Sequence, residues 1–205
     1  MPRCSDARQR LMDAAHELLW EHSYGSTSVD AICEKAGTKK GSFYHFFESK
    51  SELALAAIED NWQANKRHFD TIFSPTVPPL ERIESYLSSA LRSQEGHKQQ
   101  CGQILGCPLF SLGCEISTQD QDIRAKIVAV LDHTVKYVES AIRDAHAAGL
   151  VHAPDPGQRA RLFFMCFQGA LTQARIQNCL QPLKDFREHA MELLGVPASA
   201  YSSPN

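Results

Sequence analysis

The 205-residue sequence has no apolar run near the roughly 18 residues that a membrane-spanning helix needs. Its N-terminus, which begins Met1-Pro2-Arg3-Cys4-Ser5-Asp6, lacks the apolar core of a signal peptide. Together these absences favour a cytoplasmic protein that has no membrane partner.

The short motifs of common enzyme chemistries are also missing. The chain has no GxSxG nucleophile elbow, no phosphate-binding P-loop, no HExxH zinc motif and no dinucleotide fingerprint. We therefore predict a protein that is not an enzyme and uses no cofactor. A thiol-dependent enzyme built on Cys107 is the weaker alternative.

The cysteines form no recognisable framework. There are seven, an odd number, at positions 4, 33, 101, 107, 114, 166 and 179, and none belongs to a CxxC pair. A disulfide scaffold or a structural zinc site is therefore not expected. A metal site made from Cys101, Cys107 or Cys114 with His97 matches no known ligand spacing, so no metal is predicted.

No stretch of the chain alternates apolar and polar residues as a half-buried strand would, whereas helical periodicity recurs almost everywhere. Leu11, Ala14, Ala15 and Leu18, for example, lie on one face of a helix. We predict an all-α fold, with residues 96–106 left without a defined element. The expected helices cover residues 7–24, 28–36, 39–46, 50–73, 80–94, 108 onward, 123–148, 158–178 and 184–194.

The second and third of these helices are short and are joined by a turn at Gly37, which predicts a helix-turn-helix packed on the first helix. In such a unit the later helix enters the major groove of DNA and presents its N-terminal residues to base edges. Here that helix begins Thr38-Lys39-Lys40-Gly41-Ser42. Lysines and hydroxyls bond to DNA, and glycine permits close approach. Tyr44, His45 and Lys50 are candidates for phosphate contacts.

Local charge supports this interpretation, although the whole chain carries a formal net charge of −3. Residues 35–50 hold four lysines and one acidic residue, Glu48. Neutralising phosphates with lysine gives affinity for any duplex. A solvated basic surface that does not bind DNA is the alternative interpretation of the same lysines.

The segment Thr27-Ser28-Val29-Asp30-Ala31-Ile32-Cys33-Glu34-Lys35-Ala36-Gly37-Thr38-Lys39-Lys40-Gly41-Ser42-Phe43-Tyr44-His45-Phe46-Phe47-Glu48-Ser49-Lys50 resembles the signature of the TetR family of bacterial repressors. With the flanking residues, the resemblance covers about the first quarter of the chain. It implies a homodimer that reads a palindromic double-stranded operator and releases it when a small-molecule effector binds. By analogy, Thr27 and Ser28 would touch phosphates, and Lys40 and Ser42 would face bases. Lys39 and Glu48 depart from the common pattern, so the operator sequence does not follow.

The resemblance divides the chain into a DNA-binding domain (residues 1–49), a ligand-binding and dimerisation domain (residues 50–195) and a disordered tail (residues 196–205). The helix expected from Gln158 to Asn178 is apolar on two faces. A helix of this kind is buried on two sides, of which one can be a partner subunit. Burial within a monomer is the alternative. The predicted dimer interface comprises Leu162, Cys166, Gly169, Ile176, Phe186, Ala190 and Leu193.

Aromatic residues are spread through the predicted C-terminal domain and could line a small-molecule site. Each of them could equally be an ordinary core residue. The predicted ligand-binding residues are Trp62, Phe69, Phe73, Tyr86, Cys107, Phe110, Phe163 and Phe167.

Cys107 precedes Pro108, and proline fits the first position of a helix. The positive end of a helix favours the reactive thiolate form of a cysteine placed there. The segment also resembles a glycine-cysteine helix start in those TetR-like regulators that respond to electrophiles or oxidants. Cys101 or Cys114 could then resolve an oxidised Cys107 as a disulfide. A packed thiol without redox chemistry, or a regulator without any inducer, is the alternative.

Overall fold

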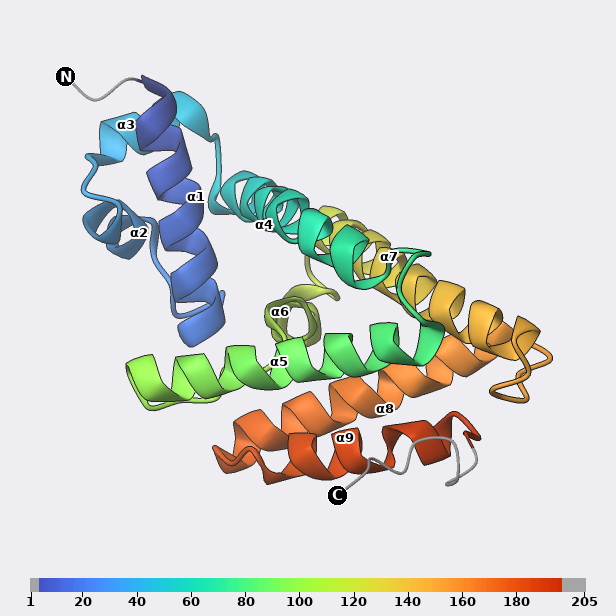
Figure 1. Ribbon diagram of the computed structural model, residues 1–205. Coiled ribbons are helices and arrows are strands. Elements are labelled where there is room, and N and C mark those ends of the chain that lie inside the picture. Colours follow the sequence, from blue (N-terminus) through green and yellow to red (C-terminus); the bar gives the residue numbers. More distant parts are fainter. Residues whose placement is uncertain (1–3, 197–205) are drawn as a thin grey trace. The chain divides into compact units, whose positions relative to one another are not determined.

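The computed structural model describes residues 4–196, with side chains from residue 6, and all regular structure in this range is helical. The helices are α1 (Cys4–Glu21), α2 (Val29–Lys35), α3 (Lys40–Phe46), α4 (Lys50–Ile72), α5 (Pro79–Cys101), α6 (Pro108–Ile116), α7 (Gln121–Ala147), α8 (Pro156–Gln177) and α9 (Gln181–Leu193) (Figure 1). The all-α prediction is therefore confirmed. The predicted disordered tail lies outside the described residues from position 197 on, while Val196 is buried.

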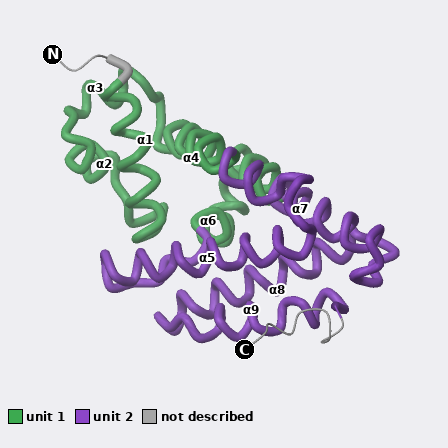
Figure 2. The backbone as a smooth tube through the Cα atoms, viewed as in Figure 1, with its two compact units in different colours: residues 1–66, 108–131 green, residues 67–107, 132–205 purple. Residues whose placement is uncertain are grey.

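The chain forms two compact units (Figure 2). The first contains residues 1–66 and 108–131, and the second contains residues 67–107 and 132–205. Because α4 and α7 run from one unit into the other, these units do not follow the predicted division after residue 49. That division concerns functional domains and stays a prediction.

The first unit is built on α1, against which α2, α3 and α6 pack. The apolar side of α1 predicted from the sequence is buried, with Leu11 and Ala15 fully inaccessible. They form one core with buried residues in or directly after α2 and α3 and in α4, namely Ile32, Cys33, Ala36, Phe43, Phe47, Leu53 and Ala57. This core fixes the helix-turn-helix.

Local capping explains where two helices of this unit begin. The hydroxyl of Ser49 accepts a hydrogen bond from the Glu52 N–H at 3.1 Å, as the predicted capping box requires. The Glu52 carboxylate reaches back to the N–H of Glu48 at 2.6 Å, one residue earlier than in the standard pattern. At the start of α7, the Asp120 carboxylate accepts hydrogen bonds from Ile123 and Asp122, and the Ile123 bond is the largest cause of its lowered pKa.

In the second unit α9 packs against both α8 and α5. The core of the second unit is apolar and comes from α5, α7, α8 and the region of α9. Its buried residues include Ile83, Leu87, Val138, Ile142, Phe163, Ala174, Leu183 and Leu194. A buried arginine ties the unit together. Arg82 is only 3% exposed and donates to Asp144 at 2.6 Å and to the carbonyl of Val77 at 2.7 Å.

Two sequence predictions about helices were wrong. Helix α5 does not end near Gln94 but continues to Cys101, so half of the segment expected to lack structure is helical. Gly96 is tolerated inside the helix, and the actual stop is Gly102, whose φ of 76° is in the left-handed region that glycine adopts readily. Helix α9 also begins at Gln181, earlier than predicted, with Pro182 in its first turn.

Over the described part of the chain, no helix combines the length and the hydropathy needed to cross a membrane. Among the same residues there is no group of three or more His, Cys, Asp or Glu side chains that could hold a metal ion.

Candidate nucleic-acid interface

The turn between α2 and α3 is held by the backbone. Ser28 is the N-cap of α2, and its hydroxyl accepts from the Ala31 N–H at 3.1 Å. Gly37 has a φ of 61°, which favours glycine, and the next N–H, that of Thr38, donates to the Cys33 carbonyl at 2.9 Å. The chain is thereby turned so that α3 starts with a fixed direction.

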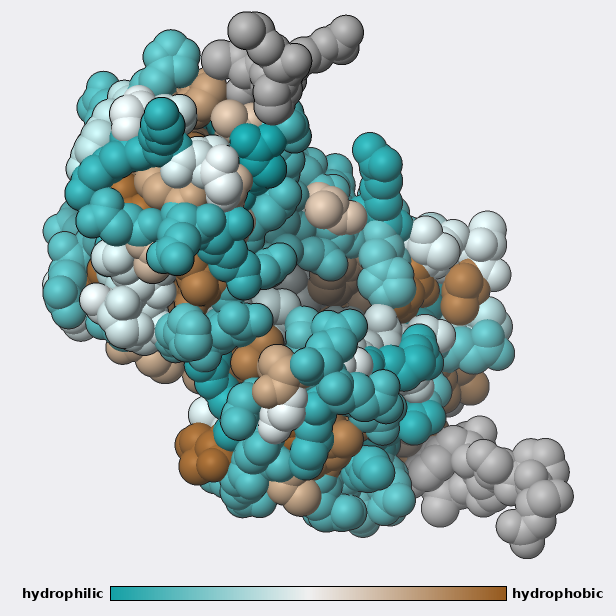
Figure 3. Space-filling model, turned by 90° about the vertical axis from the view of Figure 1, so that its left-hand side faces the viewer, coloured by the Kyte–Doolittle hydropathy of each residue, from teal (hydrophilic) through white to brown (hydrophobic). Residues whose placement is uncertain are grey.

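Helix α3 presents a polar N-terminal face to solvent. Lys39, Lys40, Gly41 and His45 are exposed, and Tyr44 is 57% exposed. Phe43 points the other way and is fully buried, so it anchors the helix. The predicted residues Lys40, Gly41 and Ser42 thus lie in the first turn of α3, directly after Thr38 and Lys39, and of these five Thr38 and Ser42 are half-buried. Figure 3 shows a face of the molecule on which hydrophilic residues predominate and hydrophobic ones are scattered.

Gly41 has open space around it. A Cβ atom added there would meet no atom of the chain within 4 Å, and the glycine has no unusual φ. Nothing inside this protein therefore requires glycine at that position. The missing side chain leaves the backbone of α3 open to close approach by another molecule.

Lysines of the helix-turn-helix are paired with acids. Lys40 Nζ lies 2.8 Å from the Asp30 carboxylate, and this hydrogen bond is the main reason that the pKa of Lys40 is raised. Lys35 Nζ lies 2.6 Å from Glu17. Both pairs are substantially exposed, so the lysines stay charged while the ion pairs fix their side chains only weakly. Lys39 occupies the N-cap position of α3 without any side-chain capping bond.

Two residues predicted to contact phosphates, Thr27 and Lys50, bond to carbonyls within the chain, and their phosphate contacts stay a prediction. The Thr27 side chain is 3% exposed and its hydroxyl donates to the Ser23 carbonyl at 2.7 Å. Lys50 Nζ donates to the carbonyls of Tyr24 and Thr27, at 2.7 and 2.9 Å, and lies 4.1 Å from the centre of the Tyr24 ring. Partial burial lowers the pKa of Lys50. These residues shape the loop that leads into α2, a role that spacing in the sequence does not reveal.

Helix α6 is bonded to the same loop. The exposed Glu115 carboxylate accepts from the backbone N–H groups of Tyr24 and Gly25, at 2.8 and 2.7 Å. Sequence reasoning missed Glu115 entirely, because its partners are backbone groups 90 residues away. The loop between α1 and α2 is therefore held by α6 on one side and by Lys50 of α4 on the other.

The segment just before Cys107 is held in the second unit. Gln94 is buried, and its side-chain oxygen accepts from the N–H groups of Leu105 and Gly106, at 3.1 and 2.8 Å. Asn178 binds the N–H of Ile104 at 2.9 Å, and Arg175 donates to the Leu105 carbonyl at 2.6 Å.

Helix α6 begins at Pro108, as predicted, so Cys107 directly precedes its first residue. Cys107 is half-buried, and the cysteines of the described chain carry no disulfide. Cys101 and Cys114 are exposed. Their predicted redox partnership with Cys107 stays a prediction.

Most of the predicted ligand-binding aromatics gather in the second unit. Phe69 stacks on Phe73 and Tyr137, and Tyr86 packs on Phe73 and Phe167 with ring centres 5.8 and 5.2 Å apart. Burial raises the pKa of Tyr86. Tyr137, which was not predicted, completes the group and is bonded to Asp70. Trp62 and Phe110 belong instead to the first unit.

The predicted dimer residues divide into two kinds. Leu162, Cys166, Gly169, Ile176 and Leu193 are exposed, with Ile176 at 73%. Ala190, in contrast, is fully buried within the chain, and Phe186 packs on Phe163 and Phe167. Met165, which was not predicted, is 60% exposed beside Cys166. The two-sided helix predicted from the sequence therefore has one side in its own core and one apolar side in solvent.

Comparison with known proteins gives the family. Residues 11–57 match the model described as bacterial regulatory proteins of the tetR family. Residues 79–190 match the model described as the C-terminal domain of tetracyclin repressor-like proteins. The second match alone covers more than half of the chain.

Curated relatives and solved structures agree. The transcriptional regulator AcuR of Cereibacter sphaeroides is 33% identical over 187 residues, which are 90% of this chain and 84% of AcuR. The HTH-type transcriptional repressor NemR of Escherichia coli is 25% identical over 94% of this chain and 96% of its own. A crystal structure of a regulatory protein TetR from Rhodobacter sphaeroides superposes with a TM-score of 0.81 at 31% identity, covering 91% of this chain and 98% of that one. The chain belongs to the TetR family of transcriptional regulators.

Proposed function

We propose that the protein is a cytoplasmic homodimeric repressor that binds a palindromic double-stranded operator and releases it in response to a small molecule or an electrophile. The observation that carries the proposal is the exposed, lysine-bearing start of α3 on a rigid helix-turn-helix core. A helix presented in this way fits the major groove, and its N-terminal residues reach base edges.

In this proposal Lys40 and Ser42 face bases, Gly41 allows close approach, and Thr38, Lys39, Tyr44 and His45 contact the backbone of the duplex with Ser28. Exposure supports these roles except for Ser42 and Thr38, which are half-buried, and the Thr38 hydroxyl oxygen is itself buried. The proposal does not depend on phosphate contacts of Thr27 or Lys50, whose polar groups bond within the loop. Each phosphate contact adds affinity that falls with salt, and each base contact adds specificity.

The exposed side of α8 supports the symmetric dimer of this proposal. Leu162, Met165 and Ile176 are 51, 60 and 73% exposed. Such an apolar surface is costly in water and marks an association site. A Cβ atom added at Gly169 would meet nothing of this chain within 4 Å, which leaves room for the close approach of a second helix. An isologous pair of these faces gives two recognition helices for two half-sites.

The effector acts, in this proposal, through the segment that leads into α6. Cys107 or the aromatic cluster of the second unit, formed by Phe69, Phe73, Tyr86, Tyr137 and Phe167, receives the effector. Gln168 follows Phe167 in the chain, is 4% exposed, and its side-chain oxygen has no hydrogen-bond partner among the described residues. Because α6 starts at the next residue, a displaced Cys107 moves this helix and with it Glu115. The loop before α2 then loses its anchor.

The names of relatives support repression. NemR of E. coli and DhaR of Mycobacterium sp. are both HTH-type transcriptional repressors, and the second is 25% identical over 91% of this chain. The proposal that this chain represses transcription rests on its similarity to these two proteins.

The experiment is operator capture followed by effector challenge. Genomic fragments retained by the purified protein are sequenced, and binding to the enriched site is measured by fluorescence anisotropy at several salt concentrations. We expect a palindromic site, two protein chains per site and weaker binding as salt rises. A protein that binds no duplex in a salt-dependent manner would contradict the proposal. If aldehydes, quinones, oxidants and small aromatics all leave the operator affinity unchanged, the protein is a regulator without an inducer.

A further inference from the structure

The lysines and arginines of α1 and the helix-turn-helix differ in what they contact. Residues 6–50 contain six of them, and three pair with acids, namely Arg10 with Asp6, Lys35 with Glu17 and Lys40 with Asp30. Lys50 donates instead to backbone carbonyls. Arg8 and Lys39 are the two that form no ion pair with any described residue. Lys39 already belongs to the proposed DNA contacts, whereas Arg8 has no role so far.

Arg8 is exposed near the start of α1, and an aromatic ring holds its head group. The guanidinium carbon lies 5.3 Å from the centre of the Phe47 ring, which is within the range of a cation–π contact. Phe47 is the buried residue at which α3 ends. Figure 1 shows the start of α1 beside α3, against which α1 packs. Arg8 therefore lies at the C-terminal end of the proposed recognition helix.

The N–H groups of Arg8 are available to an anion. A guanidinium carries five N–H groups in one plane, and they match the oxygens of a phosphate, two of which they can bind at once. Contact with an aromatic ring orients the guanidinium without using an acceptor for these groups. Asp6, the acid nearest to Arg8 in the sequence, pairs with Arg10. A phosphate could therefore bind Arg8 without first displacing a carboxylate, which is not true of Lys40.

The place of Arg8 relative to α3 suits a phosphate better than a base. Helix α3 has seven residues and is about 10 Å long, while the major groove is about 12 Å wide. When its N-terminal residues read bases, its C-terminal end lies near the edge of the groove, where the phosphates of one strand run. Tyr44, assigned above to the duplex backbone, belongs to the same aromatic group, because its ring meets Phe43 edge to face and Phe43 packs on Phe47.

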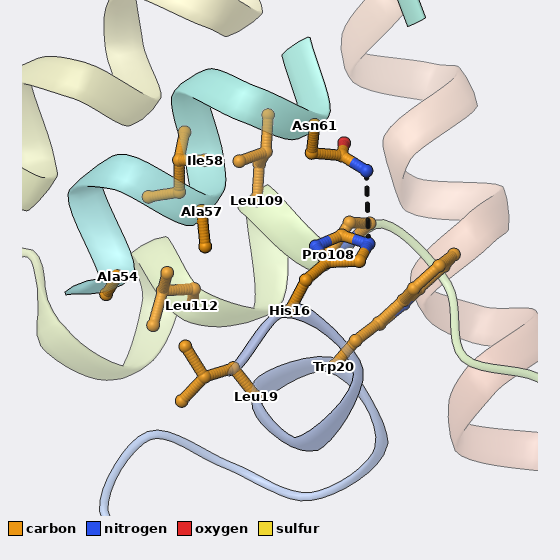
Figure 4. Close-up of a pocket in the computed structure, with 10 residues that line it drawn as sticks. All are labelled: His16, Leu19, Trp20, Ala54, Ala57, Ile58, Asn61, Pro108, Leu109 and Leu112. Carbon is orange, nitrogen blue, oxygen red and sulfur yellow. Dashed lines mark hydrogen bonds between the residues drawn. The ribbon is translucent and has the colours of Figure 1, made fainter. Parts of the chain in front are cut away.

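Helix α1 is fastened within the first unit, so Arg8 keeps this position. Near its start, Arg10 donates to the carbonyl of Ala36, just after α2, at 2.9 Å. Farther along, His16 Nε2 is joined to the Asn61 amide nitrogen of α4 at 3.2 Å, as the dashed line in Figure 4 shows. The hollow beside this bond, between α1, α4 and α6, has room for only about one water molecule. The helix that carries Arg8 is therefore closely packed along its length.

We propose that Arg8 is a further DNA contact, a phosphate-binding residue supplied by α1 and oriented by Phe47. This inference rests on the proposed function, since it needs the duplex that α3 binds. The contact adds affinity but no base preference, because the phosphates are alike at every base pair. In the symmetric dimer it occurs once in each half-site.

The test is the salt dependence of DNA binding by the full-length protein. Fluorescence anisotropy gives the affinity for the captured operator and for a random-sequence duplex between about 50 and 200 mM salt. Arg8→Met keeps a long side chain over the Phe47 ring and removes the charge. We expect it to weaken both duplexes about tenfold and to reduce the slope of log affinity against log salt by about two, one for each subunit. The ratio of the two affinities should stay as in the wild type.

Matched variants separate the charge from the packing. Arg8→Lys keeps the charge and should retain the wild-type slope, so an equal loss in Arg8→Lys and Arg8→Met would overturn the proposal. Arg124→Met removes an exposed arginine of α7 in the same unit and should leave the slope unchanged. If Arg8→Met lowers helicity by circular dichroism, Arg8→Gln replaces it with the same expected slope.

The outcomes also distinguish this inference from the proposed function. A wild-type protein that binds no duplex contradicts both. A wild-type protein that binds DNA, together with an Arg8→Met protein of unchanged slope or an Arg124→Met protein with the same loss, overturns the phosphate contact of Arg8 alone.

Discussion

The carboxylate of Glu115 accepts a hydrogen bond from the backbone N–H of Gly25 at 2.7 Å. A Cβ atom placed on Gly25 would lie 3.1 Å from the same carboxylate, so the glycine leaves little spare room. One side chain near the end of α6 thus binds the loop that leads into the helix-turn-helix. Within the first unit, this bond joins α6 directly to the N-terminal helices.

Removing this carboxylate should loosen the loop without unfolding the protein. Glu115→Ala leaves two exposed N–H groups to bond with water, so the local cost is about 1 kcal/mol. Amide hydrogen exchange at Tyr24 and Gly25 should then rise about fivefold. The control is Glu34→Ala, which truncates an exposed glutamate of α2. Unchanged protection at both amides would show that the bond contributes nothing in solution.

Lys40 and Asp30 form an exposed ion pair, with which DNA would compete if Lys40 contacts bases as proposed. We expect Lys40→Ala to weaken operator binding by about 1–3 kcal/mol and to relax base preference. Asp30→Asn removes the competing carboxylate and a negative charge, so it should strengthen binding to all duplexes. Anisotropy titrations with an operator and an unrelated duplex measure both effects. Wild-type affinity and specificity in Lys40→Ala would refute the assignment of α3 as the recognition helix.

The exposed apolar side of α8 predicts the oligomeric state. Ile176→Glu places a charge on the proposed two-fold interface. Because burying an unpaired charge is costly, we expect this variant to be a monomer. The operator affinity of this monomer should also be lower, because one protein no longer binds both half-sites at once. Val128→Glu is the control, since Val128 is 50% exposed on α7 outside that interface. Sedimentation velocity distinguishes the outcomes, and a dimeric Ile176→Glu protein would rule this interface out.

Asp144 gives a prediction about pH. The hydrogen bond from buried Arg82 is the largest cause of its lowered pKa. A carboxyl group whose folded pKa lies below the unfolded value of about 3.9 stabilises the fold above that value. This stabilisation disappears as the pH falls through the folded pKa.

We therefore expect Asp144→Asn to lower the free energy of unfolding by about 2 kcal/mol at neutral pH, a figure reduced because Asp144 is partly exposed. The difference from the wild type should shrink below about pH 4. Urea unfolding at several pH values measures it, with Asp132→Asn on the same helix as the control. A difference that is constant with pH would mean that the charge of Asp144 plays no part.

The sequence predicted those features whose signals are local. Gly37, the Ser49–Glu52 box and Pro108 each mark a helix end through its own chemistry, and each was located within a residue or two. The buried side of α1 followed from its period. The predicted end of α5 was wrong. Helix packing overrode the low helix propensity of Gly96, so the helix continues until Gly102 stops it.

Long-range bonds were beyond such reasoning. Lys50 is predicted to contact phosphate because it ends a basic stretch, whereas its bonds to carbonyls 23 and 26 residues earlier could not be predicted from the sequence. Glu115 carries no motif at all. Trp62 and Phe110 were grouped with Phe69 because all are aromatic, and only the fold shows that they belong to another compact unit. Composition can nominate such residues, but contacts made through backbone atoms leave no pattern in the sequence.

Cys107 supplies the last prediction, because it connects the two units through the chain itself. Gln94, Arg175 and Asn178 hold residues 104–106 firmly, so a bulky adduct on the Cys107 thiol cannot be absorbed by that segment. The displacement passes to Pro108 and α6 instead. N-ethylmaleimide should therefore release the wild-type protein from its operator, and Cys107→Ser should remain bound after the same treatment. Mass spectrometry verifies which thiols react, with Cys101→Ser and Cys114→Ser as controls on exposed thiols. Release of a Cys107→Ser protein by the reagent would transfer the response to another cysteine.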